Sequence, residues 1–508
     1  MSARVLVIGL DAMEATLVDR WNAVGELPNL ARLKDSARSF ELEGPVDVLP
    51  DVVWPELITG RVGASIGWYR VPEQLFSGEA RPRPIRAADV DLTAVWDLAS
   101  KAGRLVAAFD VPWAPPSRGT NGVHVWGWGT HDKPFGTRSD PEAALKGLRS
   151  HGAHAVAHDR AAKSSCDDHD DEPSSYLDLL GRLHRGIETK TALACDLLRR
   201  EPWDLFFTAF SESHCVGHHF WHFHDPSSPW HDPDAAPELV AAVKSVYSAL
   251  DGAVGQLVEA GGPNAISLVF TSHGMGPATG GWQLLPEVLV RLGYGSGGAK
   301  TTSVRSRLPE PVKRVLRTAM PGRARQRLQE AAGSLKFPLE SPGTRAVALR
   351  NSPCGAVRLN VKGREPFGAI EPGSEFDAAC AELIGELEAL EDPATGKPVV
   401  VSARRADQLF GDRAHPNVPD LLITFRRDLG PIVSVRSSRA GTVSLPFRTP
   451  SLLRSGDHVA SSRLWVTGAG GRNGDPGRGR AIDLAPTVLR LLDVTPPDSL
   501  DGRPLTSG

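Results

Sequence analysis

The chain has 508 residues, of which 41% are hydrophobic and 23% are charged, and its formal net charge is −3. This balance argues against a basic protein that binds nucleic acid polymers, and it is typical of an ordinary globular chain. No apolar run approaches the roughly 18 residues that a membrane-spanning helix needs. The length predicts either several domains or one large domain that carries insertions.

The cysteines are odd in number and lack CxxC spacing, which argues against structural disulfides and favours a reducing compartment. The apolar run that precedes Asp11 is too short for a signal peptide. We therefore expect a cytoplasmic protein with a small anionic substrate, and no nucleic acid or membrane partner. The cysteines are Cys166, Cys195, Cys215, Cys354 and Cys380.

The N-terminal part of the chain alternates between strand and helix patterns. Residues 4–11 form an apolar run that ends in Asp11, which predicts a strand with a carboxylate at its carboxyl end. From this pattern alone, Asp11 is either a metal or phosphate-site ligand or a helix N-cap. Helical spacing follows over residues 27–37, and residues 94–116 read as helix, turn and strand. The alternation predicts an α/β fold with a doubly wound, mostly parallel sheet flanked by helices.

Periodicity weakens between residues 115 and 172, where Gly, Trp, His and Asp accumulate. We interpret this segment as a lid or loop insertion over the edge of the sheet. Its tryptophans could stack on a base or sugar, although packing is their commoner role. Its histidines and aspartates leave a second metal site open, but a solvated acidic loop fits the charge pattern better.

Five histidines fall within residues 211–225, directly after an apolar run that predicts a buried strand. We expect these imidazoles in a loop at the carboxyl end of that strand, where open α/β sheets bind their ligands. Imidazole is the commonest metal ligand in proteins. We expect His214 and His218 to bind a metal, and His219, His222 and His224 to be surface or packing residues.

The remaining chain predicts a strand over residues 265–276 with His273 just past its end, and His458 before another apolar strand. We divide the chain into an α/β core (1–292), a basic helical insertion (293–345), a smaller α/β subdomain (346–405) and a C-terminal completion of the core (406–508). The core sheet is expected to resume over residues 418–425. A basic patch for a partner is the alternative interpretation of the insertion.

The chain resembles the alkaline phosphatase superfamily, and within it the type I phosphodiesterases and nucleotide pyrophosphatases, in an ordered set of short motifs. The set spans almost the whole chain. The motifs are VLVIGLDAME, LPNLARL, VVWPELITG, HCVGH, HGMG, RLNVKGREP, the GDH around His458, and AIDLAPTVLRLLDVTPPDSLDGRPL. The resemblance implies two divalent metal ions, usually zinc, with a Thr or Ser nucleophile between them.

Carried over by position, the resemblance assigns the first metal to His214, His218 and His458, with His214 in place of the family's Asp. Three neutral imidazoles and one open position are a catalytic zinc arrangement. The second metal would be bound by Asp11 and by an Asp-His pair, which here reads Ser272-His273. A neutral hydroxyl is a poor replacement for a charged ligand. The second metal site is therefore doubtful.

The position of the nucleophile is also altered, because Pro50 occupies it and no Ser, Thr or Cys lies between residues 39 and 59. Asp51 is a candidate general base or acyl-phosphate former, although it could simply cap a turn. Glu212 is a candidate second-metal ligand, or it could orient His214 or His218. Candidates for binding an anionic substrate group are Arg436, Arg439 and Arg454.

We therefore expect a metal-dependent hydrolase of phosphate esters or phosphodiesters, acting on a nucleotide-like or other small anionic substrate. Metal-bound water would attack phosphorus directly, which predicts inversion at phosphorus. The alternatives are a catalytically degenerate member that binds a phosphorylated ligand, a metal-dependent transferase or lyase, and a sulfate ester hydrolase on the same fold.

Overall fold

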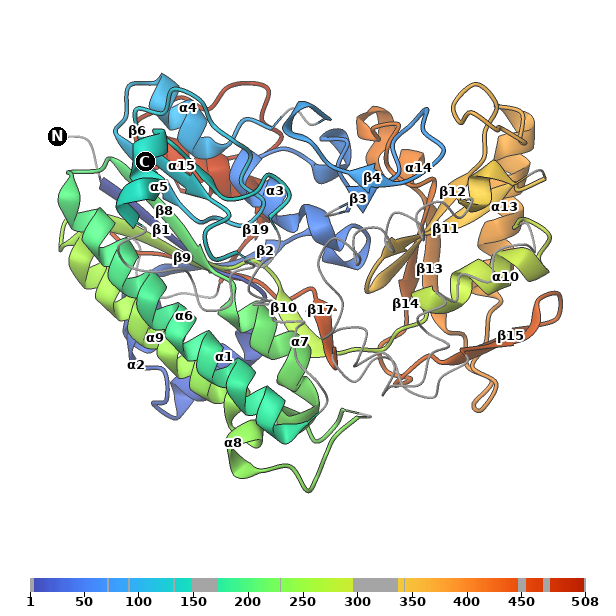
Figure 1. Cartoon of the computed structure of the whole chain (residues 1–508), viewed down its shortest axis with the longest axis horizontal. Coiled ribbons are helices and arrows are strands. Elements are labelled where there is room, and N and C mark those ends of the chain that lie inside the picture. Colours follow the sequence, from blue (N-terminus) through green and yellow to red (C-terminus); the bar gives the residue numbers. More distant parts are fainter. Residues whose placement is uncertain are drawn as a thin grey trace, which may run out of the picture.

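A computed structural model describes residues 4–70, 73–89, 92–130, 133–148, 172–228, 230–295, 337–341, 343–445, 454–468 and 476–506. Figure 1 shows a large lobe, in which a sheet is enclosed by helices, beside a smaller lobe with a sheet of its own. Within the described residues, no helix combines the length and the apolar character needed to cross a membrane.

The large lobe is built on a nine-stranded sheet in the order β19-β2-β18-β9-β1-β8-β5-β6-β7. The run from β9 to β6 is parallel, β18 and β7 are antiparallel to their neighbours, and β19 is parallel to β2. The predicted mostly parallel sheet is therefore confirmed. The strands are β1 (Arg4–Leu10), β2 (Arg38–Glu43), β5 (Val106–Phe109), β6 (Gly122–Trp126), β7 (Arg138–Asp140), β8 (Leu205–Phe210), β9 (Ala265–Thr271), β18 (Arg463–Val466) and β19 (Gly477–Arg480).

Helices cover both faces of this sheet, because the central strands are apolar on both sides. In β1, Leu6 and Ile8 belong to one buried cluster, whereas Val5 and Val7 belong to another. The first cluster includes α1 (Ala15–Ala23), α2 (Pro28–Ser36), α6 (Pro173–Arg200), α7 (Glu212–His224) and α9 (Ala242–Gly261). The second includes α3 (Val53–Thr59), α4 (Val95–Lys101) and α15 (Leu484–Leu491). The fold is thus doubly wound, as predicted.

The smaller lobe contains an antiparallel sheet in the order β11-β12-β14-β13, with α13 packed in its core. The prediction that residues 418–425 rejoin the core sheet is wrong, because β14 pairs with β12 and β13. The small sheet therefore runs past the predicted boundary at residue 405; the rest of the domain division stays a prediction. The elements are β11 (Ala346–Asn351), β12 (Cys354–Leu359), α13 (Ser374–Glu388), β13 (Val400–Arg405) and β14 (Leu421–Phe425).

The predicted lid insertion is partly wrong, because β6 and β7 extend the main sheet and a helix, α5 (Glu142–Leu148), follows them. Although Trp and Gly interrupt the apolar pattern of this segment, it forms strands at the edge of the main sheet. The acidic stretch with His154 and His158 lies outside the described residues, and so does most of the basic insertion, over residues 296–336.

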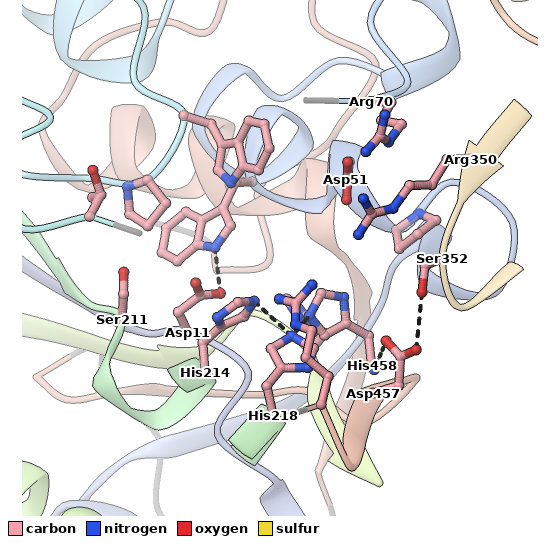
Figure 2. Close-up of a pocket in the computed structure, with 17 residues that line it drawn as sticks. Asp11, Asp51, Arg70, Ser211, His214, His218, Arg350, Ser352, Asp457 and His458 are labelled. Atoms are coloured by element: carbon pink, nitrogen blue, oxygen red, sulfur yellow. Dashed lines mark hydrogen bonds between the residues drawn. The ribbon is translucent and has the colours of Figure 1, made fainter. Parts of the chain in front are cut away.

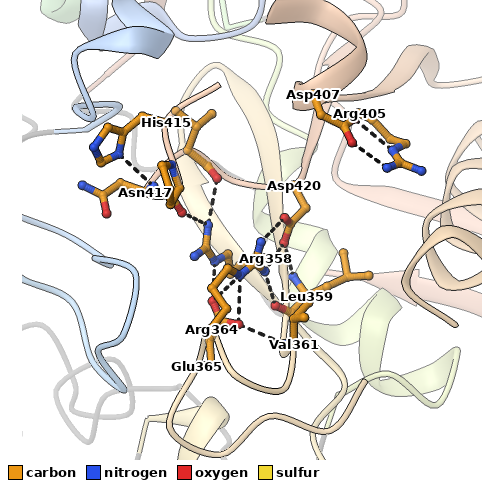
Figure 3. Close-up of polar contacts among 12 residues, drawn as sticks. Arg358, Leu359, Val361, Arg364, Glu365, Arg405, Asp407, His415, Asn417 and Asp420 are labelled. Atoms are coloured by element: carbon orange, nitrogen blue, oxygen red, sulfur yellow. Dashed lines mark hydrogen bonds and ion pairs between the residues drawn. The ribbon is translucent and has the colours of Figure 1, made fainter. Parts of the chain in front are cut away.

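A buried ionic cluster stabilises the smaller lobe where it meets the larger one (Figure 3). The guanidinium of Arg358 donates to Glu365 at 2.8 Å, and both side chains are 1% exposed. A second group on the same guanidinium donates to the carbonyls of Pro416 and Val418 at 2.6 and 2.9 Å. Arg358 therefore fixes the turn that leads into β14.

That turn contacts the large lobe through hydrogen bonds. The His415 amide donates to the Ala64 carbonyl at 3.0 Å, and the Asn417 side-chain amide donates to the Gly67 carbonyl at 3.0 Å. The side-chain Oδ1 of Asn417 accepts from the Ser77 amide at 3.0 Å. The segment from Ala64 to Ser77 is consequently held against the smaller lobe at three points.

A second buried ion pair lies inside the large lobe. The Lys190 ammonium on α6 is 2.7 Å from the Asp110 carboxylate, which follows β5, and these side chains are 1% and 0% exposed. The same carboxylate oxygen accepts from the Gly129 amide at 2.8 Å. The pair therefore ties the turn after β6 to the long helix across the sheet.

We expect Lys190→Met to lower the free energy of unfolding by about 3–5 kcal/mol, because it leaves the Asp110 carboxylate buried without its cation. Lys34→Met is the matched control, since the Lys34–Asp19 pair is 43% and 35% exposed and should contribute about 1 kcal/mol or less. Urea unfolding of both variants measures the difference. Equal losses in the two variants would contradict the buried role of Lys190.

Candidate active site

The candidate ligands come from four segments that meet at one edge of the main sheet. Asp11 follows β1, and His273 follows β9, which lies beside β1. His458 lies on β17 (Gly456–Val459), which pairs with β10 (Gly274–Pro277) so that His458 faces Met275. This convergence of strand ends agrees with the site that the strand pattern predicted.

His214 and His218 lie on α7, so the prediction that they occupy a loop is wrong. Residues four apart lie on the same face of a helix, which brings the two imidazoles together. Gly456 lets this helix approach β17 closely, since a Cβ at Gly456 would lie 2.2 Å from the Gly217 carbonyl oxygen. The helix thus delivers both side chains to His458.

The three imidazoles converge through their Nε2 atoms (Figure 2). The Nε2 of His218 is 3.1 Å from that of His214 and 3.0 Å from that of His458. Zinc–nitrogen bonds of about 2.0–2.1 Å in a tetrahedron place ligand nitrogens about 3.3 Å apart. The two observed separations are close to that spacing.

The tautomer of His218 also suits a metal ligand. Its Nδ1 is 2.7 Å from the Gly456 carbonyl oxygen, which can only accept, so Nδ1 carries the proton and Nε2 presents its lone pair. Burial lowers the pKa of His218 well below its usual value, and the nearby charge of Arg454 lowers it further. The imidazole is therefore held neutral, which is the form that binds a cation. A divalent metal fits this set of donors.

The surroundings of Asp11 differ from those of the three histidines. Its Oδ1 accepts from the Trp54 indole at 2.7 Å and from the Ser272 hydroxyl at 2.9 Å. Gly9 makes room for that indole, because a Cβ there would lie 2.6 Å from the Trp54 ring. The Ser272 hydroxyl is also 2.9 Å from Nδ1 of His273. A donor network therefore occupies this side of the site.

Fewer charged ligands surround Asp11 than the family resemblance implied for a second metal. Two N–H and O–H donors point at Asp11, and their partial positive charges oppose a cation at that oxygen. Among the described residues around this carboxylate, the substitution at Ser272 leaves one carboxylate and the His273 imidazole where the family resemblance implied a further carboxylate. Burial lowers the pKa of His273 well below its usual value, and the neighbouring His458 acts in the same direction.

A cavity of about 220 Å³ opens over the three histidines. It is lined by Pro50, which begins a short 3-10 turn (Pro50–Val52) before α3 and offers no hydroxyl. Hydroxyl groups from other elements do line it, at Thr130, Ser211 and Ser352. The residue at the position that the family resemblance assigns to the nucleophile is thus a proline that lines the cavity.

A comparison with protein families bears on what this site does. The sequence profile of the type I phosphodiesterase / nucleotide pyrophosphatase family matches residues 5–434. The chain belongs to that family. Family membership makes the protein a hydrolase of the phosphodiesterase and pyrophosphatase type, from a family that is generally metal-dependent.

Solved structures with a similar trace include two hydrolase-related proteins at low identity. Phosphonoacetate hydrolase from Sinorhizobium meliloti 1021, in complex with phosphonoformate, is 13% identical over 97% of this chain and 96% of its own, with a TM-score of 0.49. Murine ectonucleotide pyrophosphatase / phosphodiesterase 5 is 12% identical over 97% and 95%, with a TM-score of 0.46. A search of curated proteins returned no match.

Of the three arginines predicted to bind substrate in this phosphodiesterase-family chain, one lines the cavity and two do not. Arg454 lines the cavity. Arg439 pairs with Glu382 and Arg436 with Glu391, and neither arginine lines it. Two further arginines that the sequence analysis did not single out, Arg70 and Arg350, also line the cavity.

The two predicted catalytic carboxylates also lie in different places. Asp51 lines the cavity near Arg70 and Arg350 (Figure 2). Glu212, the first residue of α7, is 2% exposed and does not line the cavity. The Gly456 carbonyl, and not Glu212, orients His218. Catalytic roles for both carboxylates stay predictions.

The other three histidines of α7 pack away from the cavity. His222 bonds to the Ser455 hydroxyl at 2.7 Å through Nδ1, and His224 packs edge-on against Trp21. His219 is fully buried. The prediction that these residues serve packing agrees with their positions.

We expect the protein, purified without chelator, to contain about one divalent ion per chain by elemental analysis. His218→Ala should lose it, because two imidazoles remain of three, whereas the packing variant His224→Ala should retain it. Ser272→Asp combined with Trp54→Phe should raise the content toward two ions, since it adds a carboxylate and removes a donor. Two ions in the unaltered protein would show that Asp11 and His273 do bind a metal.

Proposed function

We propose that the protein hydrolyses small phosphate esters or phosphodiesters by direct attack of water at phosphorus, with one divalent ion, zinc in the first instance, bound by His214, His218 and His458. The observation that carries the proposal is the convergence of three Nε2 atoms, with the His218 tautomer fixed by Gly456. When bound, such an ion supplies Lewis acidity toward water and a phosphoryl oxygen.

The residues of the chain divide the remaining work. Arg454 lies close enough to His218 for its charge to lower the pKa of that imidazole, so it can also balance charge on a phosphoryl group at the histidines. Asp51 lines the cavity next to Pro50, which occupies the position of the family's nucleophile, and accepts the proton from the attacking water. The new bond joins the water oxygen to phosphorus, the ester P–O bond breaks, and the leaving alcohol takes its proton from solvent.

The identity of the nucleophile separates this route from the covalent route that the family resemblance implied. Pro50 occupies the corresponding position. A side chain with no hydroxyl or thiol cannot form a phosphoryl-enzyme bond there. Water is the nucleophile that the proposal leaves. The same arrangement favours sulfate esters as the second candidate substrate, because a sulfuryl group presents the same three peripheral oxygens.

We also propose the cytoplasm as the location and a small anionic molecule as the binding partner. The described cysteines support a reducing compartment because all are free and buried: Cys195, Cys215, Cys354 and Cys380. No nucleic acid polymer is proposed as a partner, since the net charge is −3.

Stereochemistry tests the attacking group. Hydrolysis of a phosphorothioate diester of one configuration, in ¹⁸O-labelled water, should give the inverted product, because a single displacement inverts phosphorus. Retention of configuration at phosphorus would overturn direct attack by water. If Ser211→Ala then no longer gave the retained product, the Ser211 hydroxyl would be identified as the nucleophile. If the metal-loaded protein hydrolyses neither phosphate nor sulfate esters, the protein binds its ligand without catalysis.

We expect Asp51→Asn to lower kcat by about 10²-fold or more, the usual size of a general-base contribution. The acidic limb of the pH–rate profile should disappear in this variant, because the amide cannot titrate. A carboxylate that only shapes the cavity would leave the limb in place. Glu212→Gln is the comparison, since Glu212 does not line the cavity.

A further inference from the structure

We propose that Arg70 and Arg350 form a binding site for a second anionic group of the substrate. The substrate would then be a small bis-anion, with its phosphoryl group at the three histidines and a carboxylate or second phosphoryl group at the two arginines. This inference rests on the proposed function and adds the substrate class to it.

The two arginines lie together in the cavity but come from different lobes. Figure 2 shows both beside Asp51, at the opposite end of the view from Ser211. Arg350 belongs to β11 of the smaller lobe, whereas Arg70 belongs to the loop between α3 and β3 (Glu73–Gln74) of the larger one. Both line the same cavity as His214, His218 and His458. A ligand in this cavity therefore has two charged regions available.

The position of Arg350 is fixed by the two residues that follow it. The Asn351 side-chain amide donates to the Val48 carbonyl at 2.7 Å, in the segment that leads to Pro50. The Ser352 hydroxyl donates to Asp457 at 3.1 Å, next to His458. Asn351 and Ser352, which directly follow Arg350, thus contact the segment before Pro50 and the strand that carries His458. Arg350 is thereby placed at a fixed position relative to the histidines.

The position of Arg70 is fixed by a buried glutamine. The side-chain Oε1 of Gln74 accepts from the Tyr69 amide at 3.0 Å and from the Arg70 amide at 3.4 Å. The Gln74 amide group donates to the Gly67 carbonyl at 2.8 Å, and Asn417 from the smaller lobe donates to the same oxygen. Gln74 is 1% exposed. This loop therefore presents Arg70 from a constrained backbone.

The guanidinium groups of Arg70 and Arg350 have the chemistry to bind an anion beside Asp51. Each guanidinium carries five N–H donors, and a carboxylate accepts at about four lone-pair sites. Arg70 uses one donor at 3.4 Å on the Glu73 carbonyl. The two guanidinium groups together therefore carry more donors than the Asp51 carboxylate alone can accept. Planar guanidinium groups suit carboxylate and phosphoryl oxygens because they bind in pairs of hydrogen bonds.

Charge balance points the same way. The cavity is lined by three arginines and by three aspartates, Asp11, Asp51 and Asp457, so these six side chains cancel when all are ionised. A divalent ion at the histidines adds two further positive charges. A ligand with two or more negative charges neutralises the filled cavity better than a monoanionic diester.

Binding of three unreactive phosphonates to the zinc-loaded protein tests the inference by calorimetry. Methylphosphonate has no second anionic group, 3-phosphonopropionate adds a carboxylate and ethylenebisphosphonate adds a second phosphonate. At least one bis-anion should bind about tenfold or more tightly than methylphosphonate, the effect of a single charge-assisted hydrogen bond. The tighter of the two identifies the chemistry of the second group.

Arg70→Gln and Arg350→Gln should each remove this preference and leave the affinity for methylphosphonate within about twofold, since that ligand occupies the histidine end. Arg439→Gln is the matched control, because Arg439 pairs with Glu382 outside the cavity, and it should keep the preference.

Three outcomes would overturn the inference. Equal affinity for all three phosphonates would show that no second anionic group is recognised. An equal loss of methylphosphonate and bis-anion binding in the two variants would show that the arginines hold the reacting phosphoryl group itself. If methylphosphonate fails to bind the zinc-loaded protein while zinc content is one per chain, the proposed function fails first, and the inference with it.

Discussion

The hydrogen bond from His218 Nδ1 to the Gly456 carbonyl, 2.7 Å long, is the interaction on which the site depends. It fixes the proton on one ring nitrogen and leaves the other as a lone pair directed at His214 and His458. It also joins α7 to β17, two elements more than 200 residues apart in sequence. The same backbone contact therefore sets the chemistry of the imidazole and the position of the strand that carries His458. A side chain at Gly456 would separate the two elements, because its Cβ would overlap the backbone of α7.

Near this contact, the Ser272 hydroxyl stands where the family resemblance implied a charged ligand. Ser272 and Trp54 both donate to Asp11, so a carboxylate that could bind a cation is instead neutralised by N–H and O–H dipoles. Pro50 removes the hydroxyl that the resemblance placed between two metal ions. In the proposed single-metal route the two changes are consistent with one another, because a hydroxyl nucleophile of the kind the resemblance implied lies between two cations. The three-histidine set is unaffected by either change.

Strand ends could be predicted from the sequence, and with them most of the site. Apolar runs closed by Asp11 and His273 marked carboxyl ends of buried parallel strands, and strand ends meet in space by the topology of the fold. The helix at His214 was missed because its apolar and histidine residues gave no clear helical period next to the preceding strand. The partner of β14 was missed because an apolar strand pattern does not identify the sheet it joins. Arg70 and Arg350 could not be found at all, since an arginine on a surface loop or strand end has no local signature of the cavity it lines.

The arginines show why the smaller lobe matters to a site built at the edge of the larger one. The interlobe contacts are short and directional: Asn351 to Val48, Ser352 to Asp457, and Asn417 to Gly67. Arg358, buried with Glu365, holds the turn that carries Asn417 and so supports the Arg70 loop from behind. Each contact ends on a backbone carbonyl or a carboxylate close in sequence to a residue of the site. A displacement of the smaller lobe would therefore move Arg350, the segment before Pro50 and Asp457 together. The reacting end of the cavity is therefore set by the sheet of the larger lobe, and the recognition end by the joint between the two lobes.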